Sequence, residues 1–364
     1  MARSMAQLLR GEPLLAKLFV APLAHREHRQ CRNFPKDRRG YRRMQHGVLL
    51  LGLLIAGCSW LEQGAIVLPP GAAYARSFAP QDEPHAPEQV DSALCWIVLG
   101  DWGTGGVVQR RVAAAMSALA RRTPVHFILS VGDNIYPAGV RSAQDPQWES
   151  KFARIYADSL LQVPWYPVLG NHDYRGDPDA QIAYSRRNPL WRMPARYYVV
   201  EKPLPDGTLA AFVALDTQQL LNGNPQQRAR QLRWLEEQLR RSSAQWKFVF
   251  GHHPLRSAGL YGENATLLRL LKPIFERYGV AVYFCGHEHD LQLLKHPEDG
   301  FYCVVSGAGS SARPTGYSAA SIVAAAEPGF VYAQLRKQRL SLWVIDSAGR
   351  VRYRLDVPQR RELQ

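Results

Sequence analysis

Cysteine is scarce in this sequence: five are present among 364 residues, at positions 31, 58, 95, 285 and 303. Cys95 and Cys285 lie in apolar runs of strand length, where cysteine commonly behaves as a small hydrophobic residue. If the chain is processed at Cys58, as considered below, three thiols remain, and an odd number leaves at least one unpaired. The sequence therefore predicts no disulfide.

Acidic residues are also few: 31 Asp and Glu stand against 45 Lys and Arg, a formal net charge of +14. Much of the excess lies before Cys58, where eleven basic residues face three acidic ones. The remainder lacks a zinc finger, an RNA-binding aromatic signature and a dense basic tract, so we expect no nucleic acid as a partner. Its milder positive balance suits an anionic substrate and a soluble basic surface equally well.

Long apolar runs are lacking too: the apolar stretch "GVLLLGLLIAGC" (47–58) is too short to cross a bilayer comfortably. Preceded by Arg42 and Arg43, it is typical of a signal-peptide core. Its end, "LIAGC", resembles the bacterial lipobox, which predicts that Cys58 is lipidated and anchors an exported protein to the membrane. An uncleaved anchor and cleavage after "AYA" (73–75) remain alternatives.

Composition divides the chain into three parts. We expect a leader over residues 1–57, a tether rich in Pro and Ala over 58–92, and one large domain over 93–357. Such a tether would hold the domain away from the membrane.

Five apolar runs of strand length in this domain each reach a glycine that is followed by Asp, Asn or His. They are "LCWIVLGDWG" (94–103), "VHFILSVGDNIY" (125–136), "WYPVLGNHDY" (165–174), "WKFVFGHHP" (246–254) and "AVYFCGHEHD" (281–290). Segments with helical spacing, such as 107–122 and 226–241, lie between them, and the part from 301 to 357 has the pattern of successive antiparallel strands. The alternation predicts a layered α/β domain with functional side chains at the carboxyl ends of strands.

The residues that follow these runs are rich in potential metal ligands: Asp101, Asp133, Asn171, His252, His287 and His289. If the strands lie side by side, these side chains converge. Carboxylate, amide and imidazole donors suit iron, zinc or manganese, and the lack of cysteine among them argues against a structural zinc site. The set exceeds the needs of one ion, whereas two ions bridged by a carboxylate would use it fully, as in many phosphoester hydrolases.

The blocks "GDWG", "GDNIY", "GNHD", "GHHP" and "GHEH", in this order, resemble the signature blocks of the calcineurin-like metallophosphatases. More narrowly, they are similar to those of the purple acid phosphatases of the small tartrate-resistant type. Many members of the superfamily have a histidine where this chain has Gly103; in the purple phosphatases a tyrosine three residues after the bridging aspartate replaces that ligand, here Tyr136. The resemblance implies a four-layer αββα sandwich of two mixed β-sheets flanked by helices.

The resemblance also implies the ligand sets. A ferric ion would be held by Asp101, Asp133, Tyr136 and His289, and a divalent ion (Fe, Zn or Mn) by Asp133, Asn171, His252 and His287. A trivalent ion suits the first set, because a phenol with an ordinary pKa near ~10 needs a strongly charged cation to stay deprotonated. The ions would acidify a bound water, and the resulting hydroxide would attack phosphorus.

Other polar residues of the blocks have supporting roles in this interpretation. His172 is expected near the substrate, where it orients phosphate or protonates the leaving group, and Asp173 is expected to orient its imidazole. For His253, packing explains the residue at least as well as catalysis does. Glu288 and Asp290 are interpreted as turn or supporting residues.

The favoured function is therefore an acid phosphatase that hydrolyses phosphate monoesters, on a phosphorylated small molecule or a phosphoprotein. A phosphodiesterase or nucleotide phosphatase on the same site is one alternative, and a non-catalytic surface lipoprotein is another. The intact ligand set favours an enzyme over the latter. The long Gly, Ser and Ala-rich stretch 309–330 is expected to border the site.

Overall fold

The computed structural model describes residues 86–87 and 92–359. The predicted leader (1–57), Cys58 and nearly all of the predicted tether (58–92) lie outside the described residues. Within the described ranges, no helix combines the length and the apolar character that a membrane crossing requires.

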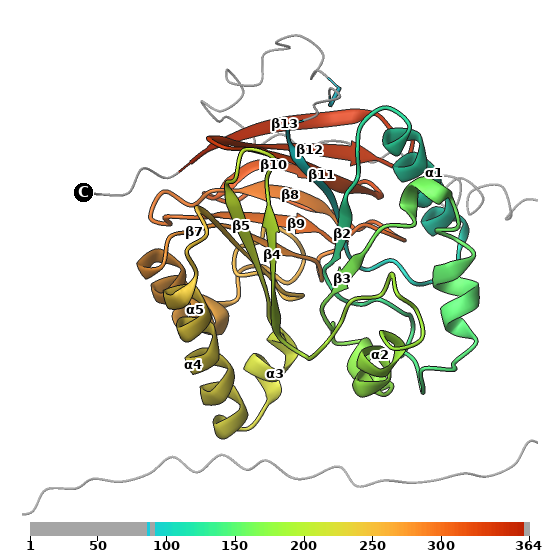
Figure 1. Ribbon diagram of the computed structural model, residues 1–364, viewed down its shortest axis with the longest axis horizontal. Coiled ribbons are helices and arrows are strands. Elements are labelled where there is room, and N and C mark those ends of the chain that lie inside the picture. Colours follow the sequence, from blue (N-terminus) through green and yellow to red (C-terminus); the bar gives the residue numbers. More distant parts are fainter. Residues whose placement is uncertain (1–85, 88–91, 360–364) are drawn as a thin grey trace, which may run out of the picture. The chain divides into compact units, whose positions relative to one another are not determined.

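Two mixed β-sheets form the centre of the domain (Figure 1). The first contains β1 (Leu94–Leu99), β2 (Phe127–Ser130), β3 (Trp165–Pro167), β11 (Gly329–Arg336), β12 (Arg339–Asp346) and β13 (Val351–Pro358), in the order β13-β12-β11-β1-β2-β3. The second contains β4 (Tyr198–Pro203), β5 (Leu209–Ala214), β6 (Trp246–Phe250), β7 (Val280–Cys285), β8 (Leu291–Leu294), β9 (Tyr302–Ser306) and β10 (Ser321–Ala325), in the order β10-β8-β9-β7-β6-β5-β4.

Helices cover the outer faces of both sheets. They are α1 (Val107–Ala120), α2 (Pro178–Tyr184), α3 (Thr217–Asn222), α4 (Pro225–Arg241) and α5 (Ala265–Arg277). In Figure 1, α3, α4 and α5 lie on one side of the sheets, and α1 and α2 lie on the other. The predicted four-layer sandwich is confirmed by this arrangement.

The space between the sheets is filled by aromatic side chains. Trp96 of β1 stacks on Phe127 of β2 with ring centroids 5.6 Å apart, and it meets Phe212 of β5 edge-on at 5.1 Å. Phe248 of β6 lies 5.5 Å from the same indole. These rings join the two sheets through one apolar layer, the principal source of stability for such a sandwich.

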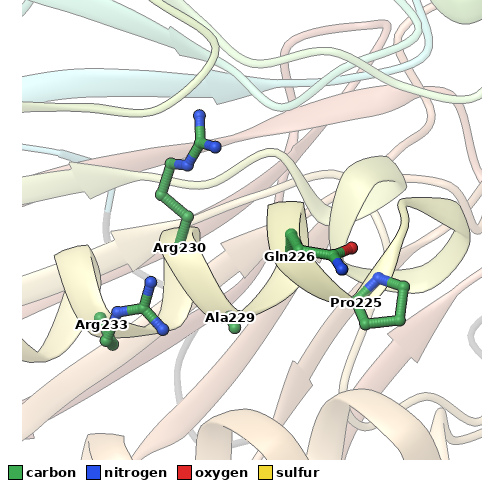
Figure 2. Close-up of a pocket in the computed structure, with 5 residues that line it drawn as sticks. All are labelled: Pro225, Gln226, Ala229, Arg230 and Arg233. Atoms are coloured by element: carbon green, nitrogen blue, oxygen red, sulfur yellow. The ribbon is translucent and has the colours of Figure 1, made fainter.

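Helix α4 shows how the local sequence sets an element. Asn224 and Gln227 form a capping box, with the Asn224 side chain accepting the Gln227 N–H at 2.9 Å, and Pro225 occupies the first helical position. Leu235 and Leu239 are buried against the second sheet. Figure 2 shows the opposite face, a surface hollow lined by Pro225, Gln226, Ala229, Arg230 and Arg233 and by none of the predicted ligands.

The C-terminal strands differ from the expected single antiparallel region. β11, β12 and β13 do pair antiparallel, and β11 continues the first sheet beside β1. β9, however, joins the second sheet, where it pairs parallel with β7 and antiparallel with β8. Val304 and Val305 of β9 are both fully buried although they point to opposite faces, which is typical of a strand inside a covered sheet.

The strands that precede the predicted ligands belong to two different sheets. β1, β2 and β3 run parallel in the first, and β6 and β7 run parallel in the second. Their carboxyl ends meet at the junction of the sheets, so convergence is achieved between sheets and not along a single one.

A buried ion-pair network fastens the loop after β6. Asp299 accepts hydrogen bonds from Nε and Nη2 of Arg256, both at 2.9 Å, and its carboxylate also pairs with Lys272 of α5. Although burial acts in the opposite direction, the two cations lower the pKa of Asp299. The loop that begins with the His252 block is thus tied to α5 and to the turn before β9.

Replacing Asp299 with Asn should lower the free energy of unfolding by about 3 kcal/mol at neutral pH, because a buried charge pair loses one partner. The Asp299 contribution is present above its unfolded pKa of about 3.9 and is lost as the pH falls through its lower folded pKa. Denaturant unfolding at several pH values measures both effects. The control Glu237→Gln, at an exposed pair on α4, should change little; equal effects of the two changes would contradict the prediction.

Candidate metal centre

Backbone strain marks three of the predicted ligands. Asp101, Asp133 and His287 have φ of 57°, 49° and 71°, and they are the non-glycine residues with positive φ among those that the structure describes. Each directly follows the glycine at the end of a strand. Such conformations cost free energy and persist where the surrounding structure imposes them, which is common at functional sites.

Glycine is required at the ends of two of the five strands, at Gly170 and Gly286, because each lies close to a carboxylate. A Cβ at Gly170 would lie 2.1 Å from Asp133 Oδ1, and a Cβ at Gly286 would lie 2.4 Å from Asp101 Oδ2. Any side chain at either position would displace a predicted ligand. At these two positions the glycine before the polar residue leaves room for the carboxylate of another block, which a side chain would occupy.

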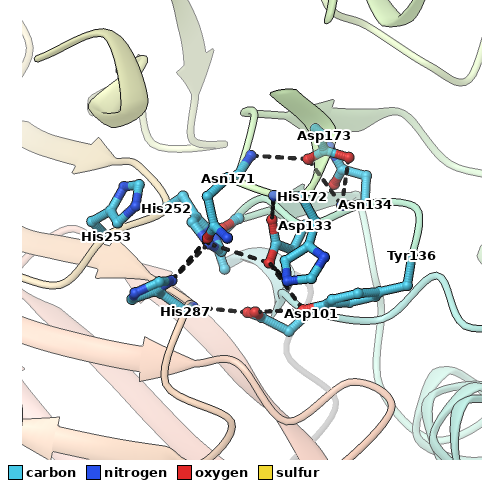
Figure 3. Close-up of polar contacts among 12 residues, drawn as sticks. Asp101, Asp133, Asn134, Tyr136, Asn171, His172, Asp173, His252, His253 and His287 are labelled. Carbon is cyan, nitrogen blue, oxygen red and sulfur yellow. Dashed lines mark hydrogen bonds and ion pairs between the residues drawn. The ribbon is translucent and has the colours of Figure 1, made fainter. Parts of the chain in front are cut away.

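Two groups of side chains are brought together, and Asp133 belongs to both (Figure 3). In the first, the Tyr136 hydroxyl lies 2.9 Å from Asp101 Oδ1 and 3.0 Å from Asp133 Oδ2. It also lies 3.2 Å from Nε2 of His289.

In the second group, Asn171 Oδ1 lies 3.1 Å from His252 Nε2 and 3.0 Å from His287 Nδ1. His252 Nε2 is also 3.6 Å from Asp133 Oδ2. All seven predicted ligands thus point into one small region, although their blocks are far apart in the sequence.

Hydrogen bonds select the nitrogen that two of the histidines, His252 and His289, present to the groups. Nδ1 of His252 donates to the carbonyl of Val131 at 2.9 Å, which leaves the lone pair of Nε2 facing the group. Nδ1 of His289 contacts the Ser311 hydroxyl at 2.7 Å, and its Nε2 likewise faces inward. Histidines that bind metals usually have such a partner on the other nitrogen.

The histidines are uncharged in this environment. Burial lowers the pKa of His252 well below its ordinary value. Burial, followed by the positive charge of Arg313, lowers the pKa of His289 to about 4. Burial is also the main cause that lowers the pKa of His287 to about 4. Neutral imidazoles keep the lone pairs that a cation requires.

The acidic groups, in contrast, are crowded and desolvated. Burial, together with the neighbouring Asp133, raises the pKa of Asp101 well above its ordinary value, and burial raises the pKa of Asp133. Burial and the two carboxylates also raise the pKa of the Tyr136 phenol. Positive charge placed among these oxygens would relieve both the repulsion and the desolvation. The donor set therefore fits metal ions, and its division around Asp133 fits two.

His172 lies beside these groups. Its Nδ1 donates to the Pro137 carbonyl at 2.6 Å, its ring centroid is 4.6 Å from that of Tyr136, and its Nε2 is 4.0 Å from Asp133 Oδ2. Its backbone N–H donates to Asp133 Oδ1 at 2.8 Å. The side chain keeps 22% exposure, so a ligand can reach it.

The hydrogen bonds of Asp173 go to partners other than the His172 imidazole that it was expected to orient. Its carboxylate accepts the N–H groups of Gly170 (2.9 Å) and Asn134 (3.1 Å) and the side-chain amide of Gln181 (2.8 Å). Within the described residues it makes no hydrogen bond to the His172 ring, whose orientation comes from Pro137 instead. The reason is geometric: Asp173 is fully buried beneath its own loop, so it binds backbone donors there.

The remaining polar residues of the blocks lie around the groups. His253 is buried, with Nδ1 2.8 Å from the Thr217 hydroxyl and its ring 4.6 Å from that of His287. Glu288 accepts the backbone N–H of Tyr261 at 2.6 Å, and Asp290 accepts the Gln292 amide at 2.7 Å. These contacts agree with packing and supporting roles.

Three residues beside the groups, Ser311, Arg313 and Tyr261, were missed by the sequence interpretation. The predicted 309–330 loop is interrupted by β10, but its first half borders the site through Ser311 and Arg313, the latter 3.1 Å from His289 Nε2. Tyr261 stacks on His287 with centroids 4.6 Å apart. One signal was available for Arg313, since it is the one charged residue between Gly307 and Ala320.

Comparison with known proteins places this geometry in a family. Residues 97–291 match the calcineurin-like phosphoesterase family. Purple acid phosphatase 4 of Arabidopsis thaliana is 36% identical over 246 residues, which cover 63% of this chain and 71% of that protein. Tartrate-resistant acid phosphatase type 5 of Homo sapiens is 33% identical over 301 residues, covering 74% and 92% of the two chains.

Solved structures share the fold. GAP50, the anchor in the inner membrane complex of Plasmodium, superposes with a TM-score of 0.69 at 24% identity, covering 75% of this chain and 91% of that one. The purple acid phosphatase PPD1 of yellow lupin seeds gives a TM-score of 0.59 at 16% identity, covering 76% and 55%. The resemblance expected from the five blocks is confirmed by the sequence relatives, and the chain belongs to the calcineurin-like phosphoesterases and, within them, to the purple acid phosphatases.

Proposed function

We propose that the protein hydrolyses phosphate monoesters with two metal ions held by Asp101, Asp133, Tyr136, Asn171, His252, His287 and His289. The observation that carries the proposal is the shared position of Asp133, whose Oδ2 lies 3.0 Å from the Tyr136 hydroxyl and 3.6 Å from His252 Nε2. One carboxylate can therefore serve both groups, as two-metal phosphoesterases require. The acid phosphatase names of the relatives support the same activity.

The first group is proposed to hold a ferric ion, and the second a divalent iron, zinc or manganese ion. The Tyr136 hydroxyl, 2.9 Å from Asp101 Oδ1 and 3.0 Å from Asp133 Oδ2, supports this assignment, because a phenol is deprotonated best by a strongly charged cation. When bound, the two ions supply positive charge that acidifies water and neutralises phosphoryl oxygens.

The chain itself supplies the proton. Because Nδ1–H of His172 donates to the Pro137 carbonyl, Nε2 is the atom that faces the centre. As an imidazolium, His172 can pass the Nε2 proton to the oxygen of the leaving alcohol, a step worth about 10²–10⁴ in rate. The hydrogen bond from the backbone N–H of His172 to Asp133 Oδ1 fixes the position of His172 relative to the shared carboxylate. Asp173 holds the loop through Gly170 and Asn134.

A paired substitution tests the function and the site together. Asp133→Asn weakens the negative charge between two cations, so metal content and turnover of nitrophenyl phosphate should fall together. His172→Ala should keep both metals and lose about 10²–10⁴ in turnover. Elemental analysis and the same assay measure both variants.

The outcomes separate the alternatives. Preference of the wild type for the bis-nitrophenyl ester would favour a phosphodiesterase, and metal-loaded protein with no turnover of either ester would favour a non-catalytic role. Two metals in Asp133→Asn with ordinary turnover would contradict the bridge, and metal loss in His172→Ala would mean that the groups are assigned wrongly.

Tyr136→Phe tests the ferric phenolate. Charge transfer from a phenolate to ferric iron gives a broad visible band, so the oxidised, iron-loaded wild type should be violet to pink. The variant removes one oxygen and keeps the ring, so absorption spectroscopy should show the band lost while the folded state is retained. A colourless wild type with two irons, or a coloured variant, would refute the assignment.

The location of the protein is a separate proposal. A lipid on Cys58, at the end of "LIAGC", would anchor an exported enzyme to a bacterial membrane. Cys58→Ala should abolish labelling with a fatty-acid analogue and move the protein from the membrane fraction to the soluble one. The proposal fails if wild-type protein carries no lipid, or if the variant stays with the membrane.

A further inference from the structure

Arg313 lies at the edge of the metal centre without an acidic partner. Its Nη2 is 3.1 Å from His289 Nε2, its Nη1 is 3.3 Å from the Tyr261 hydroxyl, and its guanidinium carbon lies 5.6 Å from the centroid of the Tyr261 ring. Within residues 92–359, no carboxylate forms an ion pair with it. A guanidinium with five donors and no carboxylate within ion-pair distance keeps donors that an anion can use.

Metal binding at His289 would remove one of the hydrogen-bond acceptors of Arg313. Nε2 of His289 has one lone pair, which can accept an N–H from Arg313 or bind a cation, but not both at once. A cation bound at His289 Nε2 would therefore take this acceptor from Nη2 of Arg313 and would place a second positive charge near the guanidinium. An anion between the two would remove the repulsion and accept the free N–H groups.

The surrounding contacts hold Arg313 at this position. Its backbone N–H donates to the carbonyl of His289 at 2.7 Å. Tyr261, which lies under the guanidinium, stacks on His287 and donates its own N–H to the buried carboxylate of Glu288 at 2.6 Å. Tyr261 remains 55% exposed, so this edge of the site is open to solvent. The guanidinium is thus fixed at the open edge and available to an incoming ligand.

We propose, as an inference that rests on the function proposed above, that Arg313 binds a non-bridging oxygen of the substrate phosphoryl group and makes the site selective for monoesters over diesters. A phosphate monoester offers up to two negative charges and three terminal oxygens, whereas a diester offers one charge and two such oxygens. The planar guanidinium of Arg313, with its paired N–H donors, therefore binds a monoester more strongly than a diester. Arg313 is therefore a substrate-binding residue, opposite in role to the proton donor His172.

Arg313→Gln tests the proposal. A second variant, Arg313→Lys, keeps the positive charge but lacks the paired N–H donors of the guanidinium. Arg230→Gln serves as the control, because it removes the same net charge at an exposed position of α4, in a hollow that none of the predicted ligands lines. Calorimetric titration of metal-loaded protein with inorganic phosphate should show a Kd raised about 10- to 100-fold in Arg313→Gln and less in Arg313→Lys. Metal content should be unchanged.

With nitrophenyl phosphate, Arg313→Gln should lower kcat/KM by a similar factor, mainly through KM, and should lower that of the bis-nitrophenyl ester less. Unchanged phosphate affinity would overturn the proposal. So would lost metal, or equal losses on both esters with a lower Tm, because these indicate a residue that only holds its loop. If Arg313 governs phosphate binding but the wild type hydrolyses neither ester, the proposed function and the ester selectivity fail, and only the assignment of Arg313 as a phosphate-binding residue stands.

Discussion

The crowding of Asp101 and Asp133 around the Tyr136 hydroxyl is the interaction on which the rest of the site depends. Two carboxylates, exposed by 0% and 2%, face the same phenol oxygen at 2.9 and 3.0 Å. Burial alone disfavours their charges, and their proximity adds repulsion. Such an arrangement is unfavourable unless positive charge enters it. Because burial lowers the pKa of His252, His287 and His289, these imidazoles offer lone pairs to a metal ion and bring no positive charge of their own.

The fold makes this crowding possible by bringing five strand ends to one junction. An aromatic layer around Trp96 fixes the two sheets against each other, so the ends of β1 and β2 face those of β6 and β7. The last step is local. Left-handed backbone at Asp101, Asp133 and His287 turns each side chain into the gap, at a cost that the packed sheets sustain.

The sequence predicted what depends on strand ends and failed where contacts between loops decide. The five glycine-polar junctions predicted a layered α/β domain and a convergent set of donors, because most of the donors directly follow the glycine after a strand. The four-layer sandwich and the role of Tyr136 were predicted only from the resemblance to a known family. The partners of Asp173 could not be predicted, because they are the backbone N–H groups of Gly170 and Asn134, which no residue type reveals. The parallel placement of β9 was missed for a similar reason, since its apolar pattern also fits a hairpin strand.

The predicted metal ligands at strand ends and the loop residues around them have different roles in the proposed reaction. Most of the donors, such as Asp133 and His252, directly follow core strands, and a change there disturbs the packing of the blocks themselves, as the contact between Gly170 and the Asp133 carboxylate illustrates. Arg313 and Tyr261, in contrast, lie on loops that are tied to the centre by a few hydrogen bonds. Loops tolerate substitution better than strand ends do. The metal site is therefore a property of the sandwich, whereas recognition of the ester is set by a rim that can differ between proteins of the same fold.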